Sequence, residues 1–219
     1  MPIIRHEQLP IAGELGVWQI QETEEWLLRQ LVLYPQELRQ LDAIKGRRRV
    51  EWLAVRQLVH VMSGREQRGA FVKDAFGKPH LEHTNWHISI SHSHEWAAAI
   101  AAPVPCGIDI QFIVPKITRL AHRFLSKEEL SCVCEPHALD MLHFFWGAKE
   151  AIYKAYGRKQ LDFIQHIHIT PFNWVSPKGQ AKGKVIIAQE APLWFDLYYE
   201  RSPNGYMLVW ALAQDNPLS

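Results

Sequence analysis

Three charged residues in two short segments have the types and spacing of a cation and phosphate site. Asp109 lies in the apolar segment 107–111, and Glu150 and Lys154 lie four residues apart in segment 146–154. A buried carboxylate is costly unless it is paired or binds a metal. Acids from two elements can hold a hard cation, and a nearby ammonium can meet a phosphate. These residues therefore predict a site for a divalent cation and a phosphorylated ligand.

A structural role is also open for each of these residues. Asp109 fits an edge strand that points it to solvent. Glu150 and Lys154 at i and i+4 are a favourable helical pair, which stabilises a helix by about 0.2–0.5 kcal/mol. Their apolar and aromatic neighbours argue against a fully solvated face. Gln111 shares the strand face of Asp109 by the two-residue period, so its amide oxygen is a candidate third metal contact.

Serines and histidines gather at the end of another predicted strand, at positions 89–94. Ser91 and His92 have the chemistry to hydrogen-bond a phosphate. A transition metal is the alternative, because several histidines lie between positions 80 and 94. No H-E-x-x-H or Cys–His spacing supports that alternative, and the chain has no G-x-S-x-G, P-loop or G-x-G-x-x-G motif.

Composition excludes several classes of protein. The 219 residues are 47% hydrophobic and 21% charged, which argues against disorder. A net charge of +1 gives no general case for binding nucleic acid or membrane. Three cysteines without paired spacing predict a reducing compartment, and no segment has a signal-peptide layout or the length to span a bilayer. We expect a cytoplasmic protein.

Hydrophobic periodicity predicts alternating strands and helices. Helices are expected over 23–33, 47–62 and 139–156, with a further helix start capped by Ser126. Strands are expected over 15–20, 87–91, 96–102, 107–111, 164–169, 184–188, 195–199 and 207–213.

A weak internal repeat links segments 52–56 and 146–150, each beginning with tryptophan and each followed by a strand–turn–strand pattern. The repeat predicts an α+β fold: a pseudodimer of two similar α/β halves, residues 1–104 and 105–219, with a ligand cleft between them. Pro103 and Pro105 suit a linker at the boundary. Arg56 takes the place of Glu150 in the first half.

Four motifs together give the chain a family resemblance. They are Gly-Lys-Pro at 77–79, Ile-Ser-Ile-Ser-His-Ser at 88–93, Gly-Ile-Asp-Ile-Gln at 107–111 and Trp-x-x-Lys-Glu-x-x-x-Lys at 146–154. In order and spacing, the chain resembles the Sfp-type 4′-phosphopantetheinyl transferases over residues 45–157. The resemblance implies magnesium-dependent transfer of phosphopantetheine from coenzyme A to a serine of an apo acyl or peptidyl carrier protein, with release of 3′,5′-ADP.

The resemblance also implies roles for particular residues. Asp109 and Glu150 would bind magnesium, and Lys154 would contact the pyrophosphate and help 3′,5′-ADP leave. Glu150, or a water that it orients, would take the serine proton. Gln111 stands where the family often has Glu, so the third metal contact would be filled by the Gln111 amide or by a water.

Coenzyme A itself is expected to contact residues in both halves. The set is Lys78, Ser91, His92, Arg56 and Lys149, with the basic cluster 45–49 as a further anion-binding candidate. We expect a monomer that binds neither nucleic acid nor membrane. Two alternatives stay open: a non-catalytic homologue that binds coenzyme A or a carrier protein, favoured by Gln111, and a histidine-based metal-binding module.

Overall fold

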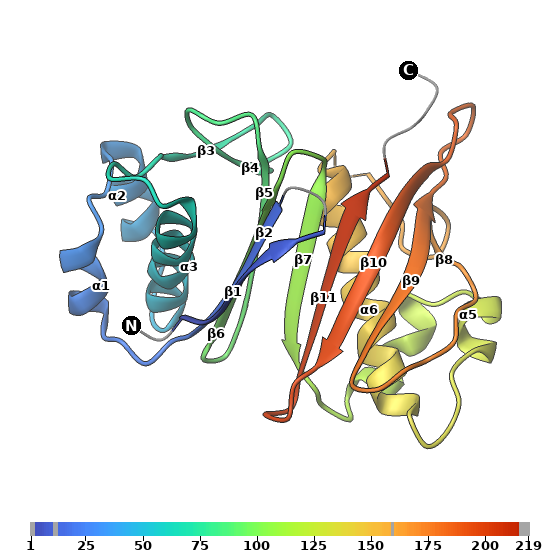
Figure 1. Cartoon of the computed structure of the whole chain (residues 1–219). Coiled ribbons are helices and arrows are strands. Elements are labelled where there is room, and N and C mark those ends of the chain that lie inside the picture. Colours follow the sequence, from blue (N-terminus) through green and yellow to red (C-terminus); the bar gives the residue numbers. More distant parts are fainter. Residues whose placement is uncertain (1–2, 11–12, 159, 215–219) are drawn as a thin grey trace. The chain divides into compact units, whose positions relative to one another are not determined.

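Tertiary contacts divide the chain into two units, Met1–Pro103 and Val104–Ser219. The computed structural model describes residues 3–10, 13–158 and 160–214. Both units combine helices with an antiparallel sheet, so the chain has the predicted α+β class (Figure 1). Each unit is described by itself below.

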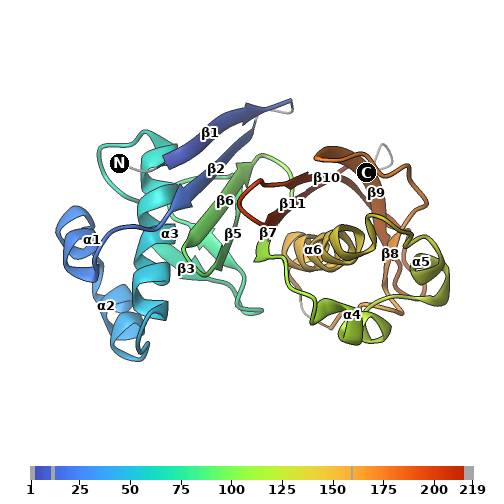
Figure 2. The same cartoon turned by 90° about the horizontal axis from the view of Figure 1, so that it is seen from below.

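The first unit packs one long helix on a four-stranded sheet. The strands lie in the order β1 (Ile3–Leu9), β2 (Gly13–Gln19), β6 (Trp96–Ala102) and β5 (His87–Ser93), all antiparallel. Helix α3 (Arg48–Ser63) covers the sheet with its apolar face (Figure 2). Gly16 leaves room for this contact, because a Cβ there would lie 2.5 Å from the Met62 sulfur.

Shorter elements complete this unit. Helices α1 (Glu24–Gln30) and α2 (Pro35–Asp42) precede α3, and β3 (Phe71–Lys73) pairs with β4 (Pro79–Leu81) in a hairpin. The Thr23 hydroxyl accepts a hydrogen bond from the Trp26 backbone N–H, which starts α1 as predicted. Gly64 ends α3 at a φ of 60°, a left-handed conformation that glycine adopts without strain.

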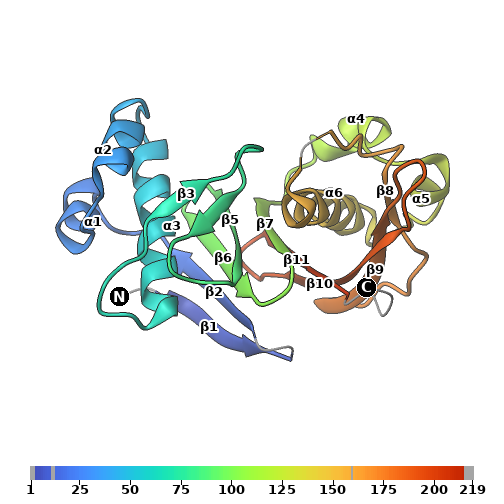
Figure 3. The same cartoon turned by 90° about the horizontal axis from the view of Figure 1, so that it is seen from above.

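The second unit packs its longest helix on a five-stranded antiparallel sheet. The strand order is β7 (Cys106–Phe112), β11 (Tyr206–Ala213), β10 (Leu193–Arg201), β9 (Lys178–Val185) and β8 (Ile167–Ile169). Helix α6 (Ala138–Tyr156) lies along the sheet, with α4 (Ile117–Leu120) and α5 (Lys127–Ser131) nearby (Figure 3). A short 3-10 helix, Ala121–Arg123, follows α4.

Several element predictions are confirmed and others need correction. Helix α6 begins one residue before its predicted start and ends at Gly157, and Ser126 forms the predicted capping box with Glu129. The strand predicted over 184–188 lies earlier, at Lys178–Val185. The prediction missed its first residues because most of them are polar and face solvent. Strand β1 and helix α2 were not predicted; α2 begins at Pro35, which suits the first helical turn. None of the described helices has the length and hydropathy needed to cross a membrane.

Candidate functional site

The centre of the candidate site lies where strand β7 packs against helix α6. A Cβ at Gly107 would lie 1.8 Å from the carbonyl oxygen of Ala151, so only glycine lets strand and helix approach this closely. Because strand side chains alternate, Asp109 and Gln111 share the face of Gly107 and point toward α6. The glycine of the 107–111 motif therefore brings the helix within reach of the acid.

Asp109 and Lys154 form an ion pair across this contact. The Lys154 ammonium donates to Asp109 Oδ1 at 2.8 Å and to the Ile108 carbonyl at 2.8 Å. The Asp109 side chain is 10% exposed, whereas that of Lys154 is 27% exposed. The pair is thus buried on the strand side and open to solvent on the lysine side.

Glu150 lies one helical turn before Lys154 and is half-buried. Burial raises the pKa of Glu150, the charge of Asp109 raises the pKa further, and the Lys154 ammonium opposes both effects. Burial and the nearby Asp109 charge therefore both disfavour the ionised form of Glu150. A cation placed beside both acids would relieve that repulsion.

Two carboxylates, those of Asp109 and Glu150, lie near one another here and are the candidate ligands for a cation. Within the described ranges, no group of three or more His, Cys, Asp and Glu side chains has the arrangement to hold a metal ion. Magnesium does not need one, because it is commonly bound by one or two carboxylates together with waters and substrate phosphates. Asp109 and Glu150 therefore fit magnesium in the presence of a phosphorylated ligand.

Gln111 does not fit the expected role of metal ligand. Its amide nitrogen donates to Asp109 Oδ2 and to the His143 carbonyl, both at 3.1 Å, and its amide oxygen lies 2.7 Å from His143 Nδ1. Rotating the amide by half a turn would set its oxygen against two acceptors. The group that faces Asp109 is therefore an NH2, which cannot bind a cation.

Lys149 is a second correction, because its side chain is completely buried. Its ammonium donates to Glu129 Oε2 at 2.7 Å and to the carbonyls of Phe163 and Ile167 at 2.7 and 2.8 Å. Burial lowers the pKa of Lys149, and the Glu129 carboxylate opposes that effect. All three ammonium protons have partners in the core, so Lys149 supports the fold of the second unit instead of contacting coenzyme A.

Arg56 is buried in the first unit in a similar way. Its guanidinium lies 3.2 Å from Glu37 Oε1 and stacks on the Trp52 ring, with 3.2 Å between the guanidinium carbon and the ring centroid. Glu37 also binds Arg68, and all three side chains are at most 4% exposed. Arg56 therefore joins a core ion-pair network, and the expected coenzyme A contact needs correction.

Ser91 and His92 lie near the end of β5, as predicted. His92 Nδ1 lies 3.0 Å from Glu51 Oε2 on α3, and the His92 side chain is 44% exposed while that of Glu51 is 11% exposed. Ser91 is buried. The exposed imidazole is thus held at the end of β5 by a largely buried acid on α3.

Lys78 lies directly before β4, close enough to the start of β5 to influence His87. It follows the β3–β4 turn, where Asp74 Oδ1 accepts from the backbone N–H groups of Phe76 and Lys78, both at 2.9 Å. After burial, the Lys78 charge is the largest influence that lowers the pKa of His87 at the start of β5. His92 lies five positions after His87 on β5, about 17 Å along the strand at the usual rise. Lys78 and His92 therefore lie near opposite ends of β5.

The basic cluster at 45–49 divides into two kinds of residue. Arg49 is tied to the fold by Glu24 at 2.8 Å and by the carbonyls of Leu41 and Ile44. Lys45 and Arg48 are exposed. These two residues are the members of the cluster that suit an anionic ligand.

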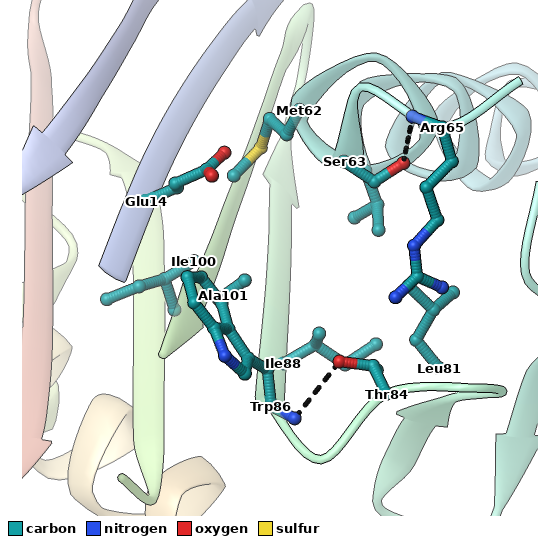
Figure 4. A pocket seen from close by; sticks show the side chains of 11 residues that line it. Glu14, Met62, Ser63, Arg65, Leu81, Thr84, Trp86, Ile88, Ile100 and Ala101 are labelled. Atoms are coloured by element: carbon teal, nitrogen blue, oxygen red, sulfur yellow. Dashed lines mark hydrogen bonds between the residues drawn. The ribbon is translucent and has the colours of Figure 1, made fainter. Parts of the chain in front are cut away.

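A cavity of about 260 Å³ lies in the first unit (Figure 4). Its walls include apolar side chains of α3 and β5, such as Met62 and Ile88, with Glu14 and Arg65 at its edge. Lys78, Ser91 and His92 do not line it. The cavity is therefore separate from the predicted coenzyme A contacts.

Comparison with known proteins agrees with the resemblance. A model of the 4′-phosphopantetheinyl transferase superfamily matches residues 105–202, which include β7 and α6. A 4′-phosphopantetheinyl transferase of Bacillus subtilis is 33% identical over 154 residues, 67% of this chain and 65% of the relative. Another from Bacillus pumilus is 30% identical over 109 residues, 48% of this chain and 47% of the relative.

The matched regions cover less than two thirds of the length of either relative. The residues that match the superfamily nevertheless include the motif on β7 and the motif on α6, where the structure pairs Asp109 with Lys154. Over the residues that carry both motifs, the chain is therefore similar to the 4′-phosphopantetheinyl transferase superfamily.

Proposed function

We propose that this chain transfers 4′-phosphopantetheine from coenzyme A to a serine hydroxyl of an apo carrier protein, with magnesium. The observation that carries the proposal is the pairing of Asp109 with Lys154 beside Glu150, inside the region that the family model matches. These residues combine a hard-cation donor set with a cation for a phosphate. The similar plan of each unit, a long helix on an antiparallel sheet, supports a pseudodimer of related halves.

Asp109 and Glu150 would hold the magnesium, which when bound neutralises charge on the pyrophosphate and stabilises the transition state. Lys78, Ser91 and His92 would bind anionic groups of coenzyme A from the first unit. Lys154 is already oriented by Asp109 and the Ile108 carbonyl. We assign Lys154 the role of stabilising the negative charge that develops on the departing 3′,5′-ADP.

In the transfer, the serine oxygen forms a bond to the phosphorus that carries the pantetheine arm. The bond from that phosphorus to the bridging oxygen breaks, and 3′,5′-ADP takes the electron pair. A water that Glu150 orients is the candidate acceptor of the serine proton, because a carboxylate that holds the metal is itself a poor base.

Intact-protein mass measurement of a panel of apo carrier proteins tests the proposal. Each carrier is incubated with this protein, coenzyme A and magnesium. At least one carrier is expected to gain the mass of phosphopantetheine, and its serine-to-alanine variant is expected to gain nothing. Omission of magnesium or addition of EDTA should prevent the gain. If no fatty-acid, polyketide or peptide-synthetase carrier is modified, the proposal fails.

The two alternatives make different predictions in the same experiment. A non-catalytic homologue would bind coenzyme A and modify no carrier. A histidine-based metal module would retain zinc and ignore coenzyme A, but the part of the chain that the structure describes has no cluster of three potential metal ligands. The paired acid and lysine on β7 and α6 favour the transferase.

A further inference from the structure

Asp109 is held from two sides, by a lysine and by an amide. Lys154 binds Oδ1, and the amide nitrogen of Gln111 donates to Oδ2 at 3.1 Å. The same amide nitrogen donates to the His143 carbonyl on α6 at 3.1 Å. Gln111 therefore connects the candidate metal ligand to the backbone of the helix that carries Glu150.

His143 fixes which way the Gln111 amide faces. Because the amide nitrogen serves two acceptors, the amide oxygen must face His143 Nδ1, and Nδ1 must carry the proton. His143 Nε2 lies 3.0 Å from the Val114 backbone nitrogen and 3.1 Å from the Val114 carbonyl oxygen; with the proton on Nδ1, it accepts from the Val114 N–H. His143 is only 2% exposed, and burial lowers its pKa, which agrees with a neutral ring.

Packing leaves little freedom for this arrangement. A Cβ at Gly147 would lie 2.9 Å from Gln111 Nε2 and 2.7 Å from a methyl of Val209. The glycine thus opens the space that the amide fills between α6 and the sheet. His143, Gly147, Glu150 and Lys154 follow the spacing of one helical face, so the whole group is presented to β7.

We infer that Gln111 and His143 are positioning residues for Asp109, through which they set the carboxylate that receives a divalent cation. The inference rests on the proposed function for its biological meaning. It replaces the third metal ligand expected at position 111 with an uncharged support from the second coordination sphere. Residues of this kind commonly change metal affinity by about 10–100-fold when they are removed.

Mn²⁺ binding, measured by electron paramagnetic resonance with and without coenzyme A, tests the inference. The variant His143→Leu removes the donor to Gln111 and should weaken Mn²⁺ binding about tenfold or more. His143→Asn keeps an N–H near the position of Nδ1 and should restore most of the affinity. The exposed His122 provides a matched control, since His122→Leu should leave affinity unchanged.

A measurement on the unaltered protein covers the case in which His143→Leu does not fold. Long-range ¹H–¹⁵N correlation spectra of the histidines should show His143 neutral with the proton on Nδ1. A proton on Nε2 alone would overturn the inference. So would equal Mn²⁺ affinity in a folded His143→Leu variant, or no Mn²⁺ binding by the parental protein.

These outcomes separate the inference from the proposed function. If no apo carrier is modified but His143→Leu still weakens Mn²⁺ binding, only the transferase proposal falls. If carriers are modified and His143→Leu binds Mn²⁺ like the parental protein, only the positioning role falls. For a true positioning role, His143→Leu should also raise the magnesium concentration for half-maximal rate more than it lowers kcat.

Discussion

Helix α6 carries two lysine–carboxylate pairs, five residues apart, with opposite surroundings. The Lys149–Glu129 pair is at most 5% exposed, and each ammonium proton has an oxygen partner. The Lys154–Asp109 pair has a lysine that is 27% exposed and lies beside a second acid, Glu150. The first pair is complete within the protein, while the second is partly open to solvent and has a second acid beside it.

This difference shows that the role of a charged residue in a motif depends on its surroundings in the folded protein. The family motif on α6 contains both lysines, yet only one side of the helix faces β7. Successive helical residues point about 100° apart, so Lys149 and Glu150 cannot serve the same site even though they are neighbours in sequence. The comparison separates a lysine that stabilises the fold from a lysine available for chemistry.

The largest expected effect is the loss of transfer in Asp109→Ala and in Glu150→Ala. Metal-ion catalysis is worth several kcal/mol, so we expect the rate of carrier modification to fall by about 10³-fold or more in either variant. Far-UV circular dichroism and thermal unfolding should show that both variants stay folded. Turnover near the parental rate in either folded variant would show that the substituted carboxylate is not needed for the transfer.

Breaking the buried Lys149–Glu129 pair should instead lower the stability of the fold. Lys149→Met leaves the Glu129 carboxylate buried without its cation and should lower the free energy of unfolding by about 3–5 kcal/mol. The matched variant Lys154→Met affects a partly exposed side chain and should cost much less stability while it abolishes transfer. Chemical denaturation of both variants checks this contrast, which fails if Lys154→Met proves the more destabilising change.

Glu150 should make stability depend on pH in the protein without metal. Its folded pKa is raised above the ordinary value of 4.5, so the folded state keeps a proton that the unfolded state has lost. As pH rises from 4.5 through the folded pKa, the parental protein should lose stability relative to Glu150→Gln. The loss is about 1.4 kcal/mol for each tenfold difference in proton affinity.

Denaturation curves of the two proteins at a series of pH values measure this difference, and saturating magnesium should reduce it. A difference that grows toward acidic pH would contradict the assigned direction of the shift.

The smallest expected effect belongs to the first unit. Lys78 would bind an anionic group of coenzyme A that changes little during reaction, so Lys78→Ala should raise KM for coenzyme A and keep kcat within a few-fold. Lys73→Ala, an exposed lysine on β3, provides the control. Steady-state kinetics distinguish the cases, and a large fall in kcat at constant KM would move Lys78 from ligand binding to chemistry.

Sequence periodicity predicted the part of the site that depends on local geometry. The two-residue period placed Asp109 and Gln111 on one face, and the i,i+4 spacing placed Glu150 with Lys154. The long helix and its end at Gly157 followed from hydrophobic spacing and the terminal glycine. The ion pair between Asp109 and Lys154 joins these two local predictions.

Other contacts depend on tertiary structure that local patterns do not contain. Lys149 meets Glu129 from twenty positions earlier, and the capping role of Glu129 gave no sign of this partner. Arg56 meets Glu37 from α2, a helix that the sequence did not predict. Its stacking on Trp52, four residues earlier on the same helix, was a signal available in the sequence. His143, seven residues before Glu150, was likewise on the predictable face.

A crystal structure with coenzyme A and Mn²⁺, with the metal located by its anomalous scattering, tests the central claim most directly. The metal should be bound by oxygens of Asp109 and Glu150, and the Lys149–Glu129 ion pair should remain intact. Metal bound through the amide oxygen of Gln111, or at a site that lacks both Asp109 and Glu150, would contradict the account.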